Sequence, residues 1–187
     1  MKKNYEDYGY KVKHGILAFQ KGPLSQWWGG LEGQSSDFSY TSPYHEGTKI
    51  TFNCCEQFMM FNKAMICGDS KSALAIMDEK SPKEQKALGR KVDNFNEEEW
   101  NKRKFDVVRI GNILKFSQSP ELMSFLVGTD GLSLVEAAPW DKIWGCGTDL
   151  EDPRTYSENM WQGENLLGKA LVEARERIIS VNNGEKA

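Results

Sequence analysis

Residues 54–67 read CCEQFMMFNKAMIC, and with them the chain changes character. The preceding part is rich in Gly, Ser, Tyr and Trp and lacks a sustained helical period, which is typical of loops and short strands. From Cys54 to Ser119 apolar residues recur at helical spacing, with strong start and stop signals. The sequence therefore predicts a mainly α fold.

Specific residues mark where these helices start and end. SPKE at residues 81–84 is a capping box with proline at the first helical position, and Gly89 stands where that helix should end. Asn96 with Glu99 starts a longer helix, and the serine-proline pair at 119–120 opens the next one. We expect residues 148–160 to form an exposed polar loop.

The domain prediction is one domain over residues 1–187. It comprises a loop-rich part (1–53) with a few short strands, a helical core (54–180) and a frayed tail (181–187). Short strands are expected at 15–19, 48–52 and 132–136, and a last helix at about 165–180.

Composition narrows the function classes. With 24 basic and 27 acidic residues the net charge is -3, and no cationic block indicates strong non-specific nucleic-acid binding. The longest apolar stretches are too short to span a bilayer, so we expect no membrane partner and a cytoplasmic location. Four cysteines without a Cys-x-x-Cys pair and only two histidines argue against a zinc site, a disulfide framework and a histidine-dependent triad.

The run DKIWGCG at residues 141–147 combines a carboxylate, an indole and two glycines. Such glycines fit a sharp turn or a close backbone approach. Trp144 offers a flat face for a base, and Asp141 offers an acceptor or acid/base group. A tight turn whose tryptophan fills the core explains the same pattern.

Glu56 and Lys63 are the principal reactive candidates. Seven residues are nearly two helical turns, so both lie on almost one line of the helix, about 10 Å apart along the axis. A lysine among methionines can acquire a lowered pKa and act as a nucleophile, and a nearby carboxylate can move protons. An ordinary lysine whose stem passes the methionines remains the alternative.

Further candidates carry charge or aromatic surface. Arg90 and Arg103 could hold a phosphate or lie in solvent. Lys115, next to Phe116, suits a ligand or the helix dipole. The WWGG run at 27–30 is typical of a mobile aromatic loop over a base, of a hydrophobic plug, or of a partner-binding patch.

Taken together, the motifs resemble the NADAR (YbiA-like) superfamily from about Leu24 to Arg177. The matching segments are LSQWW (24–28), EQFMMFNKA (56–64), ALGRKV (87–92), WNKR (100–103, its arginine offset by one), KFSQ (115–118), DKIWGCG (141–147) and WQGENLLG (161–168). Gln26 stands where the family motif has asparagine.

The resemblance implies hydrolysis of the N-glycosidic bond between a ribose anomeric carbon and an exocyclic amine, without cofactor or metal. It gives Lys63 the role of Schiff-base nucleophile, Glu56 that of proton shuttle, and Asp141 a role in sugar-ring opening or sugar binding. Substrate binding falls to the remaining candidates, which are Trp144, Gly145, Arg90, Arg103, Lys115, Ser25 and Trp100.

The resemblance also implies the partners. Long loops at 29–40 and 148–160 favour a large substrate, namely ADP-ribosylated guanine in DNA or a nucleotide, with a functional link to a DNA ADP-ribosyltransferase. The alternatives are a ribosylamino-pyrimidine phosphate of riboflavin biosynthesis as substrate, or a non-catalytic ADP-ribose or NAD-related binding module.

Overall fold

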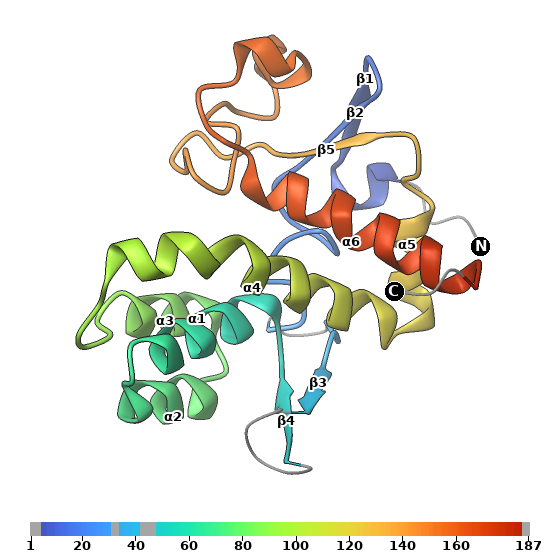
Figure 1. The fold of residues 1–187 in the computed structure, drawn as a ribbon. Helices are drawn as coiled ribbons and strands as arrows, with labels where there is room; N and C mark the ends of the chain where they lie inside the picture. Colours follow the sequence, from blue (N-terminus) through green and yellow to red (C-terminus); the bar gives the residue numbers. More distant parts are fainter. Residues whose placement is uncertain (1–4, 31–33, 42–47, 185–187) are drawn as a thin grey trace. The chain divides into compact units, whose positions relative to one another are not determined.

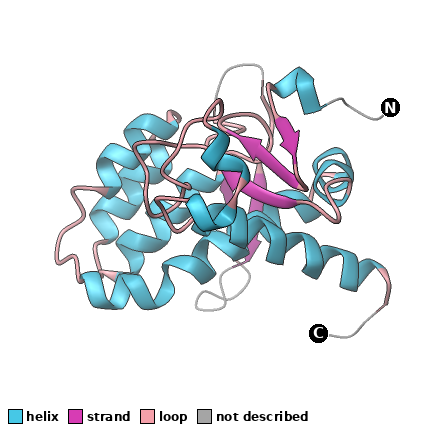
Figure 2. Ribbon diagram, turned by 90° about the horizontal axis from the view of Figure 1, so that it is seen from above, coloured by secondary structure: helices cyan, strands magenta, loops and turns pink. Residues whose placement is uncertain are grey.

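The computed structural model describes residues 5–30, 34–41 and 48–184, and the chain divides into two compact units. Unit 1 comprises Met1–Ser25 and Pro120–Ala187, and unit 2 comprises Gln26–Ser119. Unit 2 is therefore inserted in the sequence between the two parts of unit 1. Helices make up most of the regular structure (Figure 1; cyan in Figure 2), which confirms the mainly α fold.

Unit 2 is organised around helix α1 (Cys55–Ile66). It packs against α2 (Ser70–Asp78), α3 (Pro82–Gly89) and α4 (Glu97–Ser117), as Figure 1 shows. Every residue of α1 from 55 to 60 is buried. A helix enclosed on so many sides cannot be amphipathic in its first turns, which explains the dense apolar sequence there.

An antiparallel pair of strands, β3 (Phe38–Thr41) and β4 (Lys49–Phe52), completes unit 2. The rings of Phe38 and Phe52 pack with Phe58 of α1, and the Phe52 and Phe58 centroids are 5.0 Å apart in an edge-to-face arrangement. Such edge-to-face pairs add to the apolar area that they bury. The strands thus anchor the start of α1.

The predicted helix boundaries hold with one correction. Helix α3 has Pro82 at its start and ends at Gly89, and the Asn96 side chain accepts a hydrogen bond from the Glu99 N–H at the start of α4. The Ser81 hydroxyl, however, makes no cap hydrogen bond, so the predicted capping box does not form. The Ser81 backbone carbonyl instead accepts the first helical hydrogen bond, from the Gln85 N–H.

Unit 1 contains a three-stranded sheet in the order β1-β2-β5. Strand β1 (Lys11–Lys13) is antiparallel to β2 (Ile16–Phe19), and β2 is parallel to β5 (Ser133–Glu136). The unit also contains a 3-10 turn, η1 (Tyr5–Tyr8), and helices α5 (Pro120–Val127) and α6 (Leu166–Asn182). Helix α6 packs on β5 and reaches into the segment predicted to be a frayed tail.

The segment 148–160 is exposed over much of its length, as its polarity predicts, but it is not a simple loop. It contains two 3-10 turns, η2 (Pro153–Tyr156) and η3 (Glu158–Met160). The hydroxyls of Thr148 and Thr155 are 2.7 Å apart and buried, and the Tyr156 hydroxyl donates to the Leu150 carbonyl at 2.9 Å. Paired hydroxyls allow polar residues to be buried at little cost.

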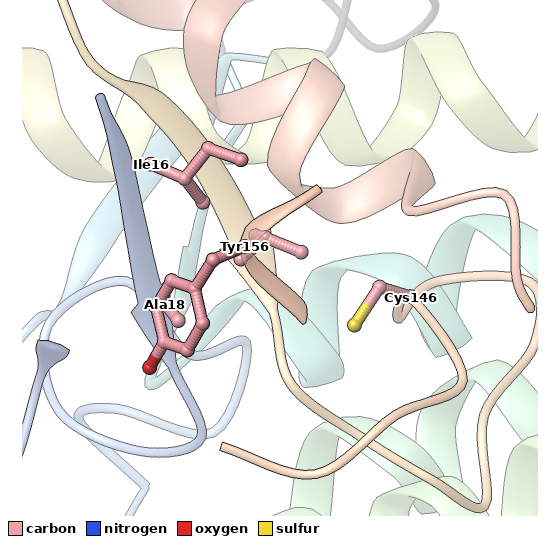
Figure 3. Close-up of a cluster of buried hydrophobic side chains, with 5 residues drawn as sticks. Ile16, Ala18, Cys146 and Tyr156 are labelled. Carbon is pink, nitrogen blue, oxygen red and sulfur yellow. The ribbon is translucent and has the colours of Figure 1, made fainter. Parts of the chain in front are cut away.

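Tyr156 also packs into an apolar cluster in unit 1. Figure 3 shows its ring near Ile16 and Ala18 of β2, with Cys146 from the 141–147 run in the same cluster. The tyrosine therefore ties the 148–160 segment to the sheet. None of the helices in the described ranges is long and apolar enough to cross a membrane.

Asn165 substitutes for a strand along the outer edge of β5. Its side chain accepts from the Glu136 N–H at 3.0 Å and donates to the Leu134 carbonyl at 2.9 Å. The residue is buried and has a positive φ of 51°. A Cβ on Gly168, one turn later, would lie 2.0 Å from the Leu134 carbonyl oxygen, so α6 begins against the strand backbone.

We predict that Asn165→Ala lowers the free energy of unfolding by about 3 kcal/mol, because two buried backbone groups lose their partner and alanine tolerates a positive φ poorly. Urea unfolding followed by circular dichroism measures the change. The matched control Asn183→Ala, at an exposed helix end, should stay within about 0.5 kcal/mol of the wild type. Equal effects of both changes would contradict the role given to Asn165.

Candidate functional site

The Lys63 amine is held between a backbone carbonyl and an aromatic ring within unit 2. Its Nζ donates to the Gly89 carbonyl oxygen at 2.7 Å and lies 4.2 Å from the centre of the Phe95 ring. The side chain is half-buried on the last turns of α1. Its position is therefore fixed by a backbone acceptor on one side and an aromatic face on another.

Gly89 brings its carbonyl within reach of the amine because it has no side chain. A Cβ at this position would lie 2.1 Å from the Met60 sulfur and 2.8 Å from its Cγ. The end of α3 can thus close on α1 only with glycine here. The GR pair at 89–90 consequently positions the lysine through the backbone.

The pKa of the Lys63 amine is lowered. Burial is the largest cause, the neighbouring Cys67 opposes it, and the Arg90 guanidinium lowers the pKa further. An amine with a lowered pKa is neutral, and so nucleophilic, at a lower pH than an ordinary lysine. Arg90 is exposed and lies near enough to influence this amine. Of the residues predicted to bind phosphate, Arg90 is therefore the one placed beside Lys63.

Glu56 is buried at the start of the same helix. Its Oε2 accepts from the Trp27 indole N–H at 3.2 Å, and its backbone N–H donates to the Gln26 carbonyl at 3.0 Å. The Gln26 side chain in turn accepts from Asn112 of α4 at 3.0 Å. Glu56 therefore belongs to a polar network inside unit 2, and one continuous helix holds it seven residues from Lys63.

The WWGG run is packed rather than a free loop. The Trp28 carbonyl accepts from the buried Ser36 hydroxyl at 2.6 Å. A Cβ on Gly30 would lie 2.5 Å from a Pro82 ring carbon. Residues 31–33 of the predicted long loop lie outside the described residues.

Lys115 lies in the interior, 1% exposed, rather than at a helix surface. Burial lowers the pKa of its amine, while the neighbouring Cys55 and Cys54 thiols oppose that shift. Burial likewise raises the pKa of Cys54 to about 12 and that of Cys55 to about 11, so neither thiol is a nucleophile at neutral pH. A phosphate could contact Lys115 only if this cluster opened.

The two other α4 candidates differ in exposure. Trp100 is buried in the first turn. Arg103 is exposed and pairs with Glu99 at 3.4 Å, an i,i+4 surface ion pair that contributes little stability. Trp100 therefore serves the core of unit 2, and Arg103 remains a candidate for long-range phosphate attraction.

The 141–147 run lies in unit 1 and forms a turn. The Asp141 Oδ1 accepts from the N–H groups of Ile143 at 3.0 Å and Trp144 at 2.8 Å. A Cβ on Gly145 would lie 2.8 Å from the Ala138 Cβ, and Gly147 has a φ of 73°. Gly145 thus serves close packing within the unit. Packing alone explains a glycine at this position, and the predicted role in substrate binding is not needed to account for it.

The same run packs against the start of helix α6 and accepts hydrogen bonds from it. Its carbonyls accept hydrogen bonds from the backbone N–H groups at 162–167; for example, Trp144 accepts from Leu167 at 3.1 Å. The first N–H groups of α6 are thereby satisfied. Trp144 is half-buried, as is Ser25, whose N–H donates to the Gly22 carbonyl. The expectation that these residues share a pocket with Lys63 stays a prediction.

Sequence reasoning missed Phe95 and the Gly89 carbonyl. Phe95 is 45% exposed in a polar connection, and a single exposed phenylalanine carries no periodic signal. In the described ranges, no three His, Cys, Asp or Glu side chains are grouped so as to hold a metal ion. All four cysteines are free thiols.

The chain thus has a mainly α fold that carries a half-buried lysine and a buried glutamate on one helix. Residues 14–179 match the NADAR domain family, and the protein belongs to this family. A solved structure, that of the Escherichia coli protein YbiA, has the same fold: the TM-score is 0.67 at 23% identity, over 95% of this chain and 92% of that one.

Named relatives are consistent with that membership. The chain is 48% identical over 121 residues to an N-glycosidase of Acanthamoeba polyphaga mimivirus, covering 65% of this chain and 71% of the relative. It is 40% identical to protein irg-1 of Caenorhabditis elegans (69% and 62%) and 32% identical to the riboflavin biosynthesis protein PYRR of Zea mays (77% and 22%). The chain thus spans less than a quarter of the maize protein's length. Family and relatives together support an enzyme that hydrolyses N-glycosidic bonds.

We predict that Trp27 and Glu56 are energetically coupled. A double-mutant cycle of Trp27→Phe and Glu56→Ala in urea unfolding should give about 1–2 kcal/mol, because the indole N–H bonds to a buried carboxylate. Glu56→Ala combined with Lys83→Ala, an exposed residue of α3, should be additive. A coupling near zero in the first cycle would show that the hydrogen bond contributes nothing.

We also predict that the Lys63 amine reacts at a lower pH than a lysine in an unstructured peptide. Reductive methylation across a pH series, followed by peptide mass spectrometry, measures the midpoint. Arg90→Gln should move the midpoint upward, because it removes a cation that disfavours the ammonium. A midpoint at the peptide's value, insensitive to Arg90, would contradict the lowered pKa.

Proposed function

We propose that this protein is an N-glycosidase that removes ADP-ribose from ADP-ribosylated guanine, in DNA or in a nucleotide. The observation that carries the proposal is the Lys63 amine, which has a lowered pKa and a fixed position on a helix that also holds the buried Glu56. An amine of this kind is suited to attack a carbon bonded to an exocyclic base nitrogen.

The proposed reaction has four steps. The bond between the anomeric carbon and the ring oxygen breaks, the oxygen takes up a proton to become a hydroxyl, and the anomeric carbon becomes a protonated imine of the base amine. Neutral Lys63 adds its lone pair to that carbon and loses a proton, giving a carbon with two nitrogen substituents. The bond to the base nitrogen then breaks, and the base leaves as its free amine after accepting a proton. Water finally adds to the lysine iminium and releases the sugar as an aldehyde, restoring Lys63.

The other candidates have proposed roles in these steps. Glu56 would move the protons between water and the two amines. Arg90 and Arg103 would attract the diphosphate, and Trp144 would stack on the base. The Asp141 carboxylate already accepts hydrogen bonds from two backbone N–H groups. We therefore propose that Asp141 supports the turn that carries Trp144, and we prefer this role to one in sugar-ring opening.

The substrate class has one alternative with a specific observation behind it. Similarity to plant riboflavin biosynthesis proteins favours a ribosylamino-pyrimidine phosphate, which has the same bond between an anomeric carbon and an exocyclic amine. The longer segments at 29–40 and 148–160 favour the larger ADP-ribosyl substrate. Turnover of both compounds side by side, at equal concentrations, distinguishes the two.

We predict that borohydride links the sugar covalently to the wild-type protein during turnover of an ADP-ribosylated DNA oligonucleotide. Lys63→Ala should abolish both linkage and ADP-ribose release, whereas Lys83→Ala, at an exposed position of α3, should change neither. Intact-protein mass spectrometry and chromatography of released ADP-ribose are the two readouts. Equal linkage in Lys63→Ala would remove Lys63 as the nucleophile.

The same assay tests the non-catalytic alternative. Tight binding of the oligonucleotide or of free ADP-ribose, without turnover of either substrate class, would identify a binding module and overturn the proposed enzyme. Release from the pyrimidine substrate alone would retain the N-glycosidase and replace the substrate.

A further inference from the structure

Phe95 is an exposed aromatic residue that the proposed reaction leaves without a role. It lies in the connection between α3 and α4, and its ring face covers the Lys63 amine, with Nζ 4.2 Å from the ring centre. At 45% exposure the ring is not a core residue. The contact of its ring face with the Lys63 amine therefore lies at the surface of unit 2.

The connection that carries Phe95 is held at both ends. The buried Asp69 caps α2 by accepting from the Ser72 N–H at 2.9 Å, and its other oxygen accepts from the Asp93 N–H at 2.9 Å. After Phe95, Asn96 begins helix α4. Two anchors within three residues of Phe95 fix the backbone that carries its ring.

Nζ is cationic in two states of the reaction, the resting ammonium and the lysine iminium. In the resting ammonium, Nζ carries three hydrogens and donates one to Gly89. In the lysine iminium, Nζ keeps one hydrogen and remains part of a cation whose charge is shared with the anomeric carbon. Both the Gly89 carbonyl and the ring face of Phe95 can therefore act on the intermediate as they act on the ammonium. A ring quadrupole attracts a partly desolvated cation at this distance.

We propose that Phe95 is a catalytic residue whose ring face stabilises the cationic iminium formed on Lys63. This inference rests on the proposed function, because it requires the lysine to become a Schiff base. The bond changes are those given above; Phe95 forms and breaks no bond and exchanges no proton. Its contribution is electrostatic and depends on the electron density of the ring.

Progressive fluorination of Phe95 tests this dependence at nearly constant size. Phenylalanine carrying one, two and three ring fluorines is incorporated at position 95, and the borohydride-linked fraction is measured during turnover. We expect the fraction to fall stepwise with each fluorine, by about three- to tenfold over the series, because each fluorine weakens the quadrupole. The same series at Phe61, a half-buried ring on α1 that lies edge-on to Phe52, should leave the fraction unchanged.

Natural side chains provide a second measurement. Phe95→Leu should lower the linked fraction and kcat, and Phe95→Trp should restore both, since tryptophan binds cations best. An unchanged fraction across the fluorinated series would overturn the role of Phe95 while Lys63-dependent linkage remained. If borohydride linked no more sugar to the wild-type protein than to Lys63→Ala, the proposed function itself would be overturned. The two failures are therefore distinguishable.

Discussion

The enclosure of helix α1 is the constraint on which the rest of unit 2 depends. Six consecutive residues, 55–60, are buried, so the helix has no solvent face at its start. A carboxylate in that stretch has to be hydrogen-bonded, and the Trp27 indole provides one partner for Glu56. Because the helix is continuous, burial at one end and the half-buried Lys63 near the other are set by a single rigid element.

A different principle governs unit 1, where backbone fits against backbone. The 141–147 carbonyls satisfy the first N–H groups of α6, and Asn165 satisfies the free edge of β5. Glycines stand where another atom would collide, as Gly168 does with the Leu134 carbonyl. The 141–147 run, which in the sequence most resembles a ligand-binding motif, thus connects strand β5 to helix α6 through backbone hydrogen bonds.

The sequence predicted what short-range chemistry decides. Asn96 with Glu99, Pro82 and Gly89 mark helix ends through local hydrogen bonds and backbone freedom, and the structure agrees. It failed where long-range packing decides: Tyr156 of the polar 148–160 segment is buried against Ile16 and Ala18 of β2. For the candidate site, residue types and spacing predict Glu56 and Lys63, and their roles stay a prediction. The Gly89 carbonyl has no side-chain signal, and Phe95 becomes noticeable only once the fold places its ring over Nζ.

The surroundings of Lys63 favour opposite protonation states of its amine. Burial and Arg90 favour the neutral amine, whereas the Gly89 carbonyl and the Phe95 face favour the cation. In the proposed reaction, a site built only to lower the pKa of Lys63 would produce a good nucleophile and then destabilise the iminium that the lysine becomes. Contacts that recognise charge at Nζ, whether ammonium or iminium, offset that difficulty. The balance between burial and these two contacts is therefore the physical reason that a half-buried lysine, rather than a fully buried one such as Lys115, would suit the proposed reaction.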